Sequence, residues 1–187
     1  SDLEDDVKPR NGISDEEDNG KISTRGSGSN DLRELIEGWQ ALSSAQQGSL
    51  NILVAFGGAR KQGWRGVKYA DMACIQQDGK DNYFGNDSCY QEQDAQANMS
   101  EEQTLKSFLD KVKSQSKDDS RVVVDLWDHG AAFLGMGHDT NHDSAELIPL
   151  PQLQSAFQKS GLKVDLLGFD ACLMASLEVA RVVQPFA

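Results

Sequence analysis

Two residues in this sequence have the chemistry of a nucleophile and its base. Cys172 follows the apolar run 164–169, and His129 follows the apolar run 121–127. A thiolate attacks carbonyl carbon, and a histidine near its ordinary pKa exchanges a proton at neutral pH. If both runs are parallel strands of one sheet, their carboxyl ends meet at the same edge. The pattern indicates a Cys–His dyad, although a small buried cysteine and an ordinary His-Gly turn also fit the spacing.

The neighbours of these two residues support the same chemistry. Gly130 has no side chain, so its N–H can approach a substrate oxygen and form an oxyanion hole with the N–H of Cys172. A last helix is predicted over residues 172–184, ending before Pro185. Cys172 would then lie at a helix N-terminus, where the partial positive charge favours the thiolate.

The elements that must position these residues alternate between helices and strands. Apolar runs predict strands over residues 50–56, 65–72, 121–127 and 164–169. Helices are predicted over residues 30–45, capped by Asn30, from a capping box of Ser100 with Gln103, and from Pro151 to Gly161. Because the strands are unbroken apolar runs, we expect an α/β domain with a mostly parallel sheet covered on both faces.

Charge and hydropathy exclude two classes of function. The 187 residues contain 18 Lys and Arg against 30 Asp and Glu, a net charge of −12, which argues against nucleic-acid binding. No apolar run approaches the roughly 18 residues that a membrane span needs. Residues 1–28 are acidic and lack apolar periodicity, so we expect a loosely ordered leader or pro-segment there and the folded domain over residues 29–187.

Calcium is a possible ligand of the leader. Asp15, Glu17 and Asn19 stand at the offsets of an EF-hand loop, but the twelfth position, which should be a bidentate acid, is Gly26. A solvated acidic tail is the alternative. The polar loop with Asp78, Asp81 and Asp87 also allows either interpretation.

Two other groups of residues leave alternatives open. Cys74 and Cys89 bracket a polar stretch, and they are either a disulfide of an exported protein or two reduced thiols. His138, Asp139, His142 and Asp143 would suit zinc on a helix, but the surrounding glycines favour a polar loop beside the cleft.

Three segments carry a family resemblance. LLGFDACLMASLEVA, residues 166–180, resembles the nucleophile signature of the clostripain family of cysteine peptidases. RVVVDLWDHG, residues 121–130, is similar to the strand that leads to that family's catalytic His-Gly, and residues 138–157 resemble its connecting loop and helix. After the His-Gly, where the family often has a glycine and an aromatic, this chain has Ala131, Ala132 and Phe133.

The resemblance implies a caspase-like three-layer α/β/α sandwich and a secreted, periplasmic or cell-surface endopeptidase made as a zymogen. It implies His129 and Cys172 as the dyad and Asp170 as the residue that selects Arg or Lys before the scissile bond. No cofactor is needed for this chemistry, although calcium would be a structural or activating ion.

The resemblance also bears on the rest of the protein. Since the chain ends at Ala187, directly after the nucleophile segment, we expect the distal strands in a second chain or a C-terminal continuation. Arg10, Lys21 and Arg25 are candidates for self-processing. The alternative function is a catalytically silent, calcium-dependent binding module on the same fold.

Overall fold

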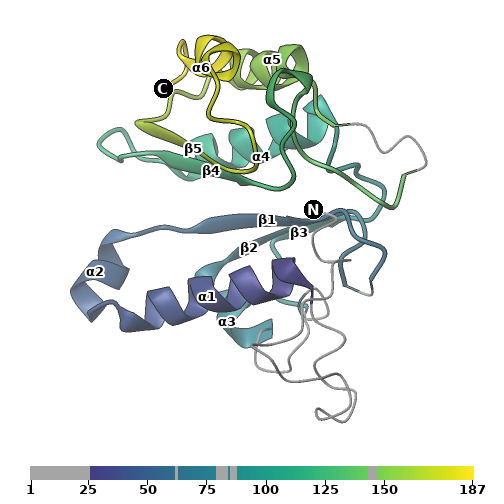
Figure 1. The fold of residues 1–187 in the computed structure, drawn as a ribbon. Helices are drawn as coiled ribbons and strands as arrows, with labels where there is room; N and C mark the ends of the chain where they lie inside the picture. The colour runs from purple at the N-terminus through teal and green to yellow at the C-terminus, as the bar shows by residue number, and fades with distance from the viewer. Residues whose placement is uncertain (1–25, 62, 79–83, 85–87, 143–146) are drawn as a thin grey trace. The chain divides into compact units, whose positions relative to one another are not determined.

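The computed structural model describes residues 26–61, 63–78, 84, 88–142 and 147–187. These residues form two compact units, which divide between residues 96 and 97 (Figure 1). Among their helices, none has the length and apolar character needed to cross a membrane. The calcium candidates Asp15, Glu17 and Asn19 and the processing candidates Arg10, Lys21 and Arg25 lie outside the described residues.

The first unit is a small antiparallel sheet with helices packed on it. It contains α1 (Ser27–Ala41), α2 (Ser44–Ser49), β1 (Leu53–Gly57), β2 (Val67–Asp71), α3 (Met72–Asp78) and β3 (Glu92–Asp94). The strand order is β1-β2-β3, and both pairings are antiparallel. Its core consists of buried apolar side chains from the sheet, α1, α3 and the loops, including Leu32, Phe56, Trp64, Ala70, Ile75 and Phe84.

The antiparallel pairing corrects the expectation of a mostly parallel sheet. Nine residues, 58–66, join β1 to β2, whereas a parallel crossover needs about a dozen or more. A turn of this length can only reverse the chain. It does so through Gly57 and Gly66, where a Cβ on Gly57 would lie 1.8 Å from the carbonyl oxygen of Gly66.

The first helix begins earlier than the sequence pattern predicts. The residue before α1 is Gly26 rather than Asn30, and the N–H of Asn30 already donates to the carbonyl of Gly26 at 3.2 Å. Asn30 therefore belongs to the first turn and not to the cap. α1 ends at Ala41, and only the last two residues of the predicted helix, 44–45, belong to α2, whose N-terminus has a capping box of Ser43 with Gln46.

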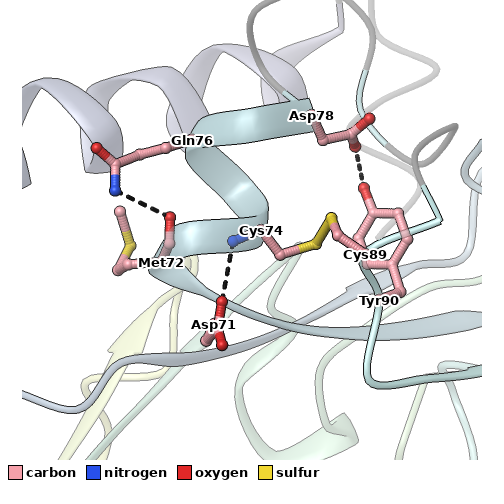
Figure 2. The surroundings of a disulfide bond; sticks show 7 residues. All are labelled: Asp71, Met72, Cys74, Gln76, Asp78, Cys89 and Tyr90. Atoms are coloured by element: carbon pink, nitrogen blue, oxygen red, sulfur yellow. Dashed lines mark hydrogen bonds between the residues drawn. A yellow bond between two sulfur atoms is a disulfide. The ribbon is translucent and has the colours of Figure 1, made fainter.

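A disulfide joins α3 to the segment that precedes β3. Of the two alternatives that the sequence leaves open, the structure has the bonded one: Cys74 and Cys89 form a disulfide with a Cα–Cα distance of 5.4 Å (Figure 2). Next to it, the hydroxyl of Tyr90 donates to the buried carboxylate of Asp78 (Figure 2). Asp78 is thus engaged inside the unit, while Asp81 and Asp87 lie outside the described residues.

The second unit is built around two parallel strands. It contains α4 (Glu102–Gln115), β4 (Val123–Trp127), the short 3₁₀ helix η3 (Ala132–Leu134), α5 (Leu150–Ser160), β5 (Leu166–Asp170) and α6 (Leu177–Val183). The crossover from β4 to β5 runs through α5, and the two strands pair in parallel from Val123↔Leu166 to Trp127↔Asp170. This pairing agrees with the prediction for residues 121–127 and 164–169, and the two units together confirm a mixed α/β fold.

Alternation along β4 and β5 separates a packed face from an open one. Val124 and Leu126 of β4, with Leu167 and Phe169 of β5, pack against the helices. Val123 and Leu166 are paired on the opposite face and are exposed. The side chains that point to this second face include Asp125 and Asp170, which therefore share a surface.

Polar contacts join α4 to α5 and join the two segments that precede β4 and β5. The carboxylate of Glu102 in α4 accepts hydrogen bonds from Ser155 and Lys159 of α5, at 2.9 and 2.5 Å. Before the strands, Asp165 accepts the N–H of Val122 at 2.8 Å and pairs with Arg121 at 2.9 Å. These hydrogen bonds hold the pKa of Asp165 below its usual value.

Two helices in this unit begin later in the chain than the sequence pattern predicts. The capping box of Ser100 with Gln103 does not form, because the helix begins one residue later, after Glu101, and the buried hydroxyl of Ser100 has no partner. The last helix begins at Leu177 rather than at Cys172, with Ser176 as its N-cap. Cys172 therefore lies in a turn before α6 and not at a helix N-terminus.

Candidate active site

The parallel register places His129 and Cys172 at one edge of the sheet. Trp127 and Asp170 form the last pair of β4 with β5, and each candidate residue follows two positions later. Both are exposed, and Cys172 is a free thiol. Because paired parallel strands end side by side, the two loops that carry these residues leave the sheet together (Figure 1).

Gly130 is in direct contact with the loop of the cysteine. A Cβ built on Gly130 would lie 2.1 Å from the carbonyl oxygen of Cys172 and 2.8 Å from the side chain of Met174. Met174 is buried and anchors the cysteine loop in the core. Only a residue without a side chain fits here, so the His-Gly loop and the cysteine loop are packed backbone against backbone.

Asp128 holds the backbone of the histidine. Its buried carboxylate accepts the N–H of His129 at 2.6 Å and the N–H of His138 at 3.2 Å. The carbonyl of His129 in turn accepts the N–H of Gly137 at 2.9 Å. The N–H and the carbonyl of His129 are therefore both hydrogen-bonded within the loop 128–138. These bonds fix the backbone position from which the imidazole side chain extends.

Asp170 ends β5 and is exposed on the open face of the sheet. Asp125 lies on the same face, two pairs earlier, opposite Gly168. Partial burial raises the pKa of Asp125, and the negative charge of Asp170 raises it further. This edge is therefore an electronegative surface next to Cys172, which suits a cationic side chain.

The loop after the His-Gly is held by a buried acid. Asp139 has 0% of its surface exposed and accepts hydrogen bonds from the N–H of Met99 and from Asn141, at 2.8 to 3.0 Å. Its carboxylate lies 4.0 Å from Nε2 of His142. Asp143 lies outside the described residues, within which no group of three His, Cys, Asp or Glu side chains is placed to hold a metal ion.

Two non-glycine residues have a positive φ among those that the structure describes, and both adjoin this site. They are Ala132, with φ 54°, at the start of η3, and Leu173, with φ 62°, directly after Cys172. A left-handed conformation is unfavourable for alanine and leucine, because it places the Cβ too close to the following carbonyl oxygen. Backbone strain of this kind is concentrated at functional sites.

The comparison with known families agrees with this geometry. A family model described as the clostripain family matches residues 18–187, which include both units and the site. The chain belongs to the clostripain family. Neither the curated proteins nor the solved structures gave a match to it. Membership implies a cysteine peptidase, and it places the chain in the family that the segments around His129 and Cys172 resemble.

Three features of this clostripain-family site are not evident from the sequence pattern. The carboxylate of Asp128 adjoins the His-Gly in the sequence, but its hydrogen bond to His138 depends on the fold of the loop. Asp125 is visible in the sequence as an acid within β4, but its place on the same face as Asp170 depends on the strand register. The left-handed backbone of Leu173 has no signal at all, since leucine is a poor residue for that conformation.

Proposed function

We propose that the chain is a cysteine endopeptidase that cleaves after arginine or lysine, on a caspase-like α/β fold. The observation that carries this proposal is the contact between Gly130 and the backbone of Cys172. This contact supports the roles proposed for the two loops, with His129 as general acid–base, Cys172 as nucleophile, and the N–H groups of Gly130 and Cys172 as oxyanion donors. The electronegative face at Asp170 and Asp125 supports a basic residue before the scissile bond.

In the proposed mechanism, His129 takes the proton of the Cys172 thiol, and the resulting thiolate attacks the scissile carbonyl carbon and forms a tetrahedral intermediate. The N–H groups of Gly130 and Cys172 donate to its oxyanion. His129 gives a proton to the leaving amine, and the C–N bond breaks, which leaves a thioester. His129 then takes a proton from water, whose oxygen displaces the thiolate and releases the new carboxyl group.

Asp170 is the proposed selector of the substrate's basic side chain. Its carboxylate would pair with a guanidinium or an ammonium group, and a guanidinium can bind it through two parallel hydrogen bonds. The disulfide of Cys74 with Cys89 supports an oxidising compartment for the protein, and therefore secretion.

Hydrolysis of short coumarin peptides that end in Arg, Lys, Asp or Ala tests the proposal. We expect turnover after Arg and Lys, loss of turnover in Cys172→Ala and His129→Ala, and loss of the preference for Arg in Asp170→Asn. Asp165→Asn is the matched control, because it removes the same charge at the opposite end of β5 and should keep the preference. Equal turnover after Asp and Arg would overturn the assignment of Asp170, and full activity of Cys172→Ala would overturn the mechanism.

A further inference from the structure

Trp127, the last residue of β4, is the register partner of Asp170, the last residue of β5. Paired residues of two parallel strands project to the same face of the sheet, and the strands lie about 4.8 Å apart. The preceding pair, Leu126 and Phe169, points to the packed face. Because successive side chains alternate between the two faces, Trp127 and Asp170 are neighbours on the open face.

Packing inside the unit does not account for a tryptophan at this position. Trp127 is half-buried, but it is not among the described apolar side chains that pack in the core of this unit. Asp170 is exposed, and within the described part of the chain its carboxylate has no hydrogen-bond donor or cationic partner. The end of the strand pair therefore presents an aromatic ring and a carboxylate side by side.

An indole ring beside a carboxylate suits a guanidinium group in particular. A carboxylate binds the edge of a guanidinium through two parallel hydrogen bonds, and an aromatic ring within about 6 Å binds its flat face. An ammonium group has no flat face and is more strongly hydrated, so it gains less from the ring.

The charge of the open face favours a cation between the two side chains. Asp125 lies on this face, two pairs before Trp127, and its carboxylate extends over β5, since a Cβ on Gly168 would overlap its Oδ1. A second negative charge thus lies along the strands from Asp170. The occupant that complements both the ring and the charge is a planar cation.

We infer that Trp127 is a specificity-determining residue, whose ring stacks on the guanidinium of the substrate's arginine while Asp170 pairs with the guanidinium edge; this inference rests on the proposed function. Asp170 attracts arginine and lysine alike, whereas Trp127 favours arginine. Loss of the Asp170 charge should therefore weaken cleavage after both residues, and loss of the Trp127 ring should weaken cleavage after arginine.

Two coumarin peptides that differ only in ending in Arg or in Lys measure this preference as the ratio of their kcat/KM values. We expect a ratio of about ten in the wild-type protein, the size of one desolvated cation–π contact. In Trp127→Leu the ratio should fall below about three, with little change for the Lys peptide. Trp127→Phe, which keeps an aromatic ring, should retain most of the preference. Trp39→Leu, which removes a half-buried tryptophan from the other unit, is the matched control and should keep the wild-type ratio.

The same two peptides separate this inference from the proposed function. If the wild-type protein hydrolyses neither peptide, the proposed function fails and the inference fails with it. If it hydrolyses both with equal kcat/KM, only the role of Trp127 is refuted, and this result does not depend on whether Trp127→Leu folds. If Trp127→Leu lowers kcat/KM for both peptides by the same factor, the ring merely supports the end of the strand, and the inference is overturned.

Discussion

Replacing Gly130 with alanine tests the contact on which the site is built. Gly130 does not have a positive φ, so alanine causes no conformational strain there. The added Cβ would lie 2.1 Å from the carbonyl oxygen of Cys172, far inside ordinary van der Waals contact, and 2.8 Å from the side chain of Met174. Met174 is buried in the core, so the cysteine loop cannot move without disturbing that packing.

The size of the effect follows from this overlap. The carbonyl of Cys172 must retreat by about 1 Å, and an overpacked site of this kind costs about 1–3 kcal/mol of the free energy of unfolding. A displacement of about 1 Å between reacting groups can lower a rate about 100-fold. We therefore expect Gly130→Ala to fold with reduced stability and to lose about 100-fold in kcat/KM.

Urea unfolding and hydrolysis of a coumarin peptide ending in Arg measure the two effects, and the rate at which iodoacetamide labels Cys172 reports on the thiol directly. Gly161→Ala is the control: Gly161 ends α5 with φ 61°, so alanine there costs about 1 kcal/mol but leaves the site intact. If Gly130→Ala keeps wild-type kcat/KM, the two loops are not packed as described, and the proposed arrangement of the site is refuted.

Three further predictions concern other interactions. Asp128→Ala leaves two backbone N–H groups without their acceptor and should cost about 1–3 kcal/mol in urea unfolding, with a larger loss of kcat/KM than of stability; an unaltered kcat/KM would show that the carboxylate does not position His129. Reduction of the disulfide, or Cys74→Ala with Cys89→Ala, should lower stability by about 3 kcal/mol for a loop of this length, measured with and without reductant; equal stability in both conditions would count against a structural role. Since the pKa of Asp125 is raised in the folded protein, its folded state holds this proton more tightly than the unfolded chain. The contribution of Asp125 to stability should therefore fall as pH rises above about 3.9, and Asp125→Asn should remove this contribution. Asp170→Asn should lower the pKa of Asp125 in an NMR titration, whereas an unmoved pKa would exclude coupling of the two acids.

Much of the second unit could be predicted from local patterns. The apolar runs 121–127 and 164–169 became β4 and β5, and Pro151 and Gly161 marked the ends of α5 closely. These signals are reliable because burial of a strand or a helix face depends on periodicity within a few residues. The starts of helices were less predictable: Asn30 and Ser100 are good capping residues, but the chain begins each helix at a different position.

The pairing of strands was predicted correctly only where a crossover helix separates them. Between β4 and β5 the chain is long enough for α5, so the strands are parallel. Between β1 and β2 it is too short for a crossover, and the pair is antiparallel. The position of Cys172 relative to the last helix was also not predictable from the sequence. A left-handed turn at Leu173 follows the cysteine, and α6 begins only at Leu177.

By itself, the sequence determined the residue types at the site, their positions directly after two buried strands, and the family to which the chain belongs. Those properties depend on composition and spacing along the chain. Only the tertiary structure decided that Gly130 lies against Cys172, that Asp128 binds the backbone at His138, and that Leu173 is held in a left-handed turn. Gly130 and Cys172 are far apart in the sequence, the contact of Asp128 with His138 depends on the fold of the loop between them, and leucine does not favour a left-handed backbone. No local propensity therefore specifies these three features.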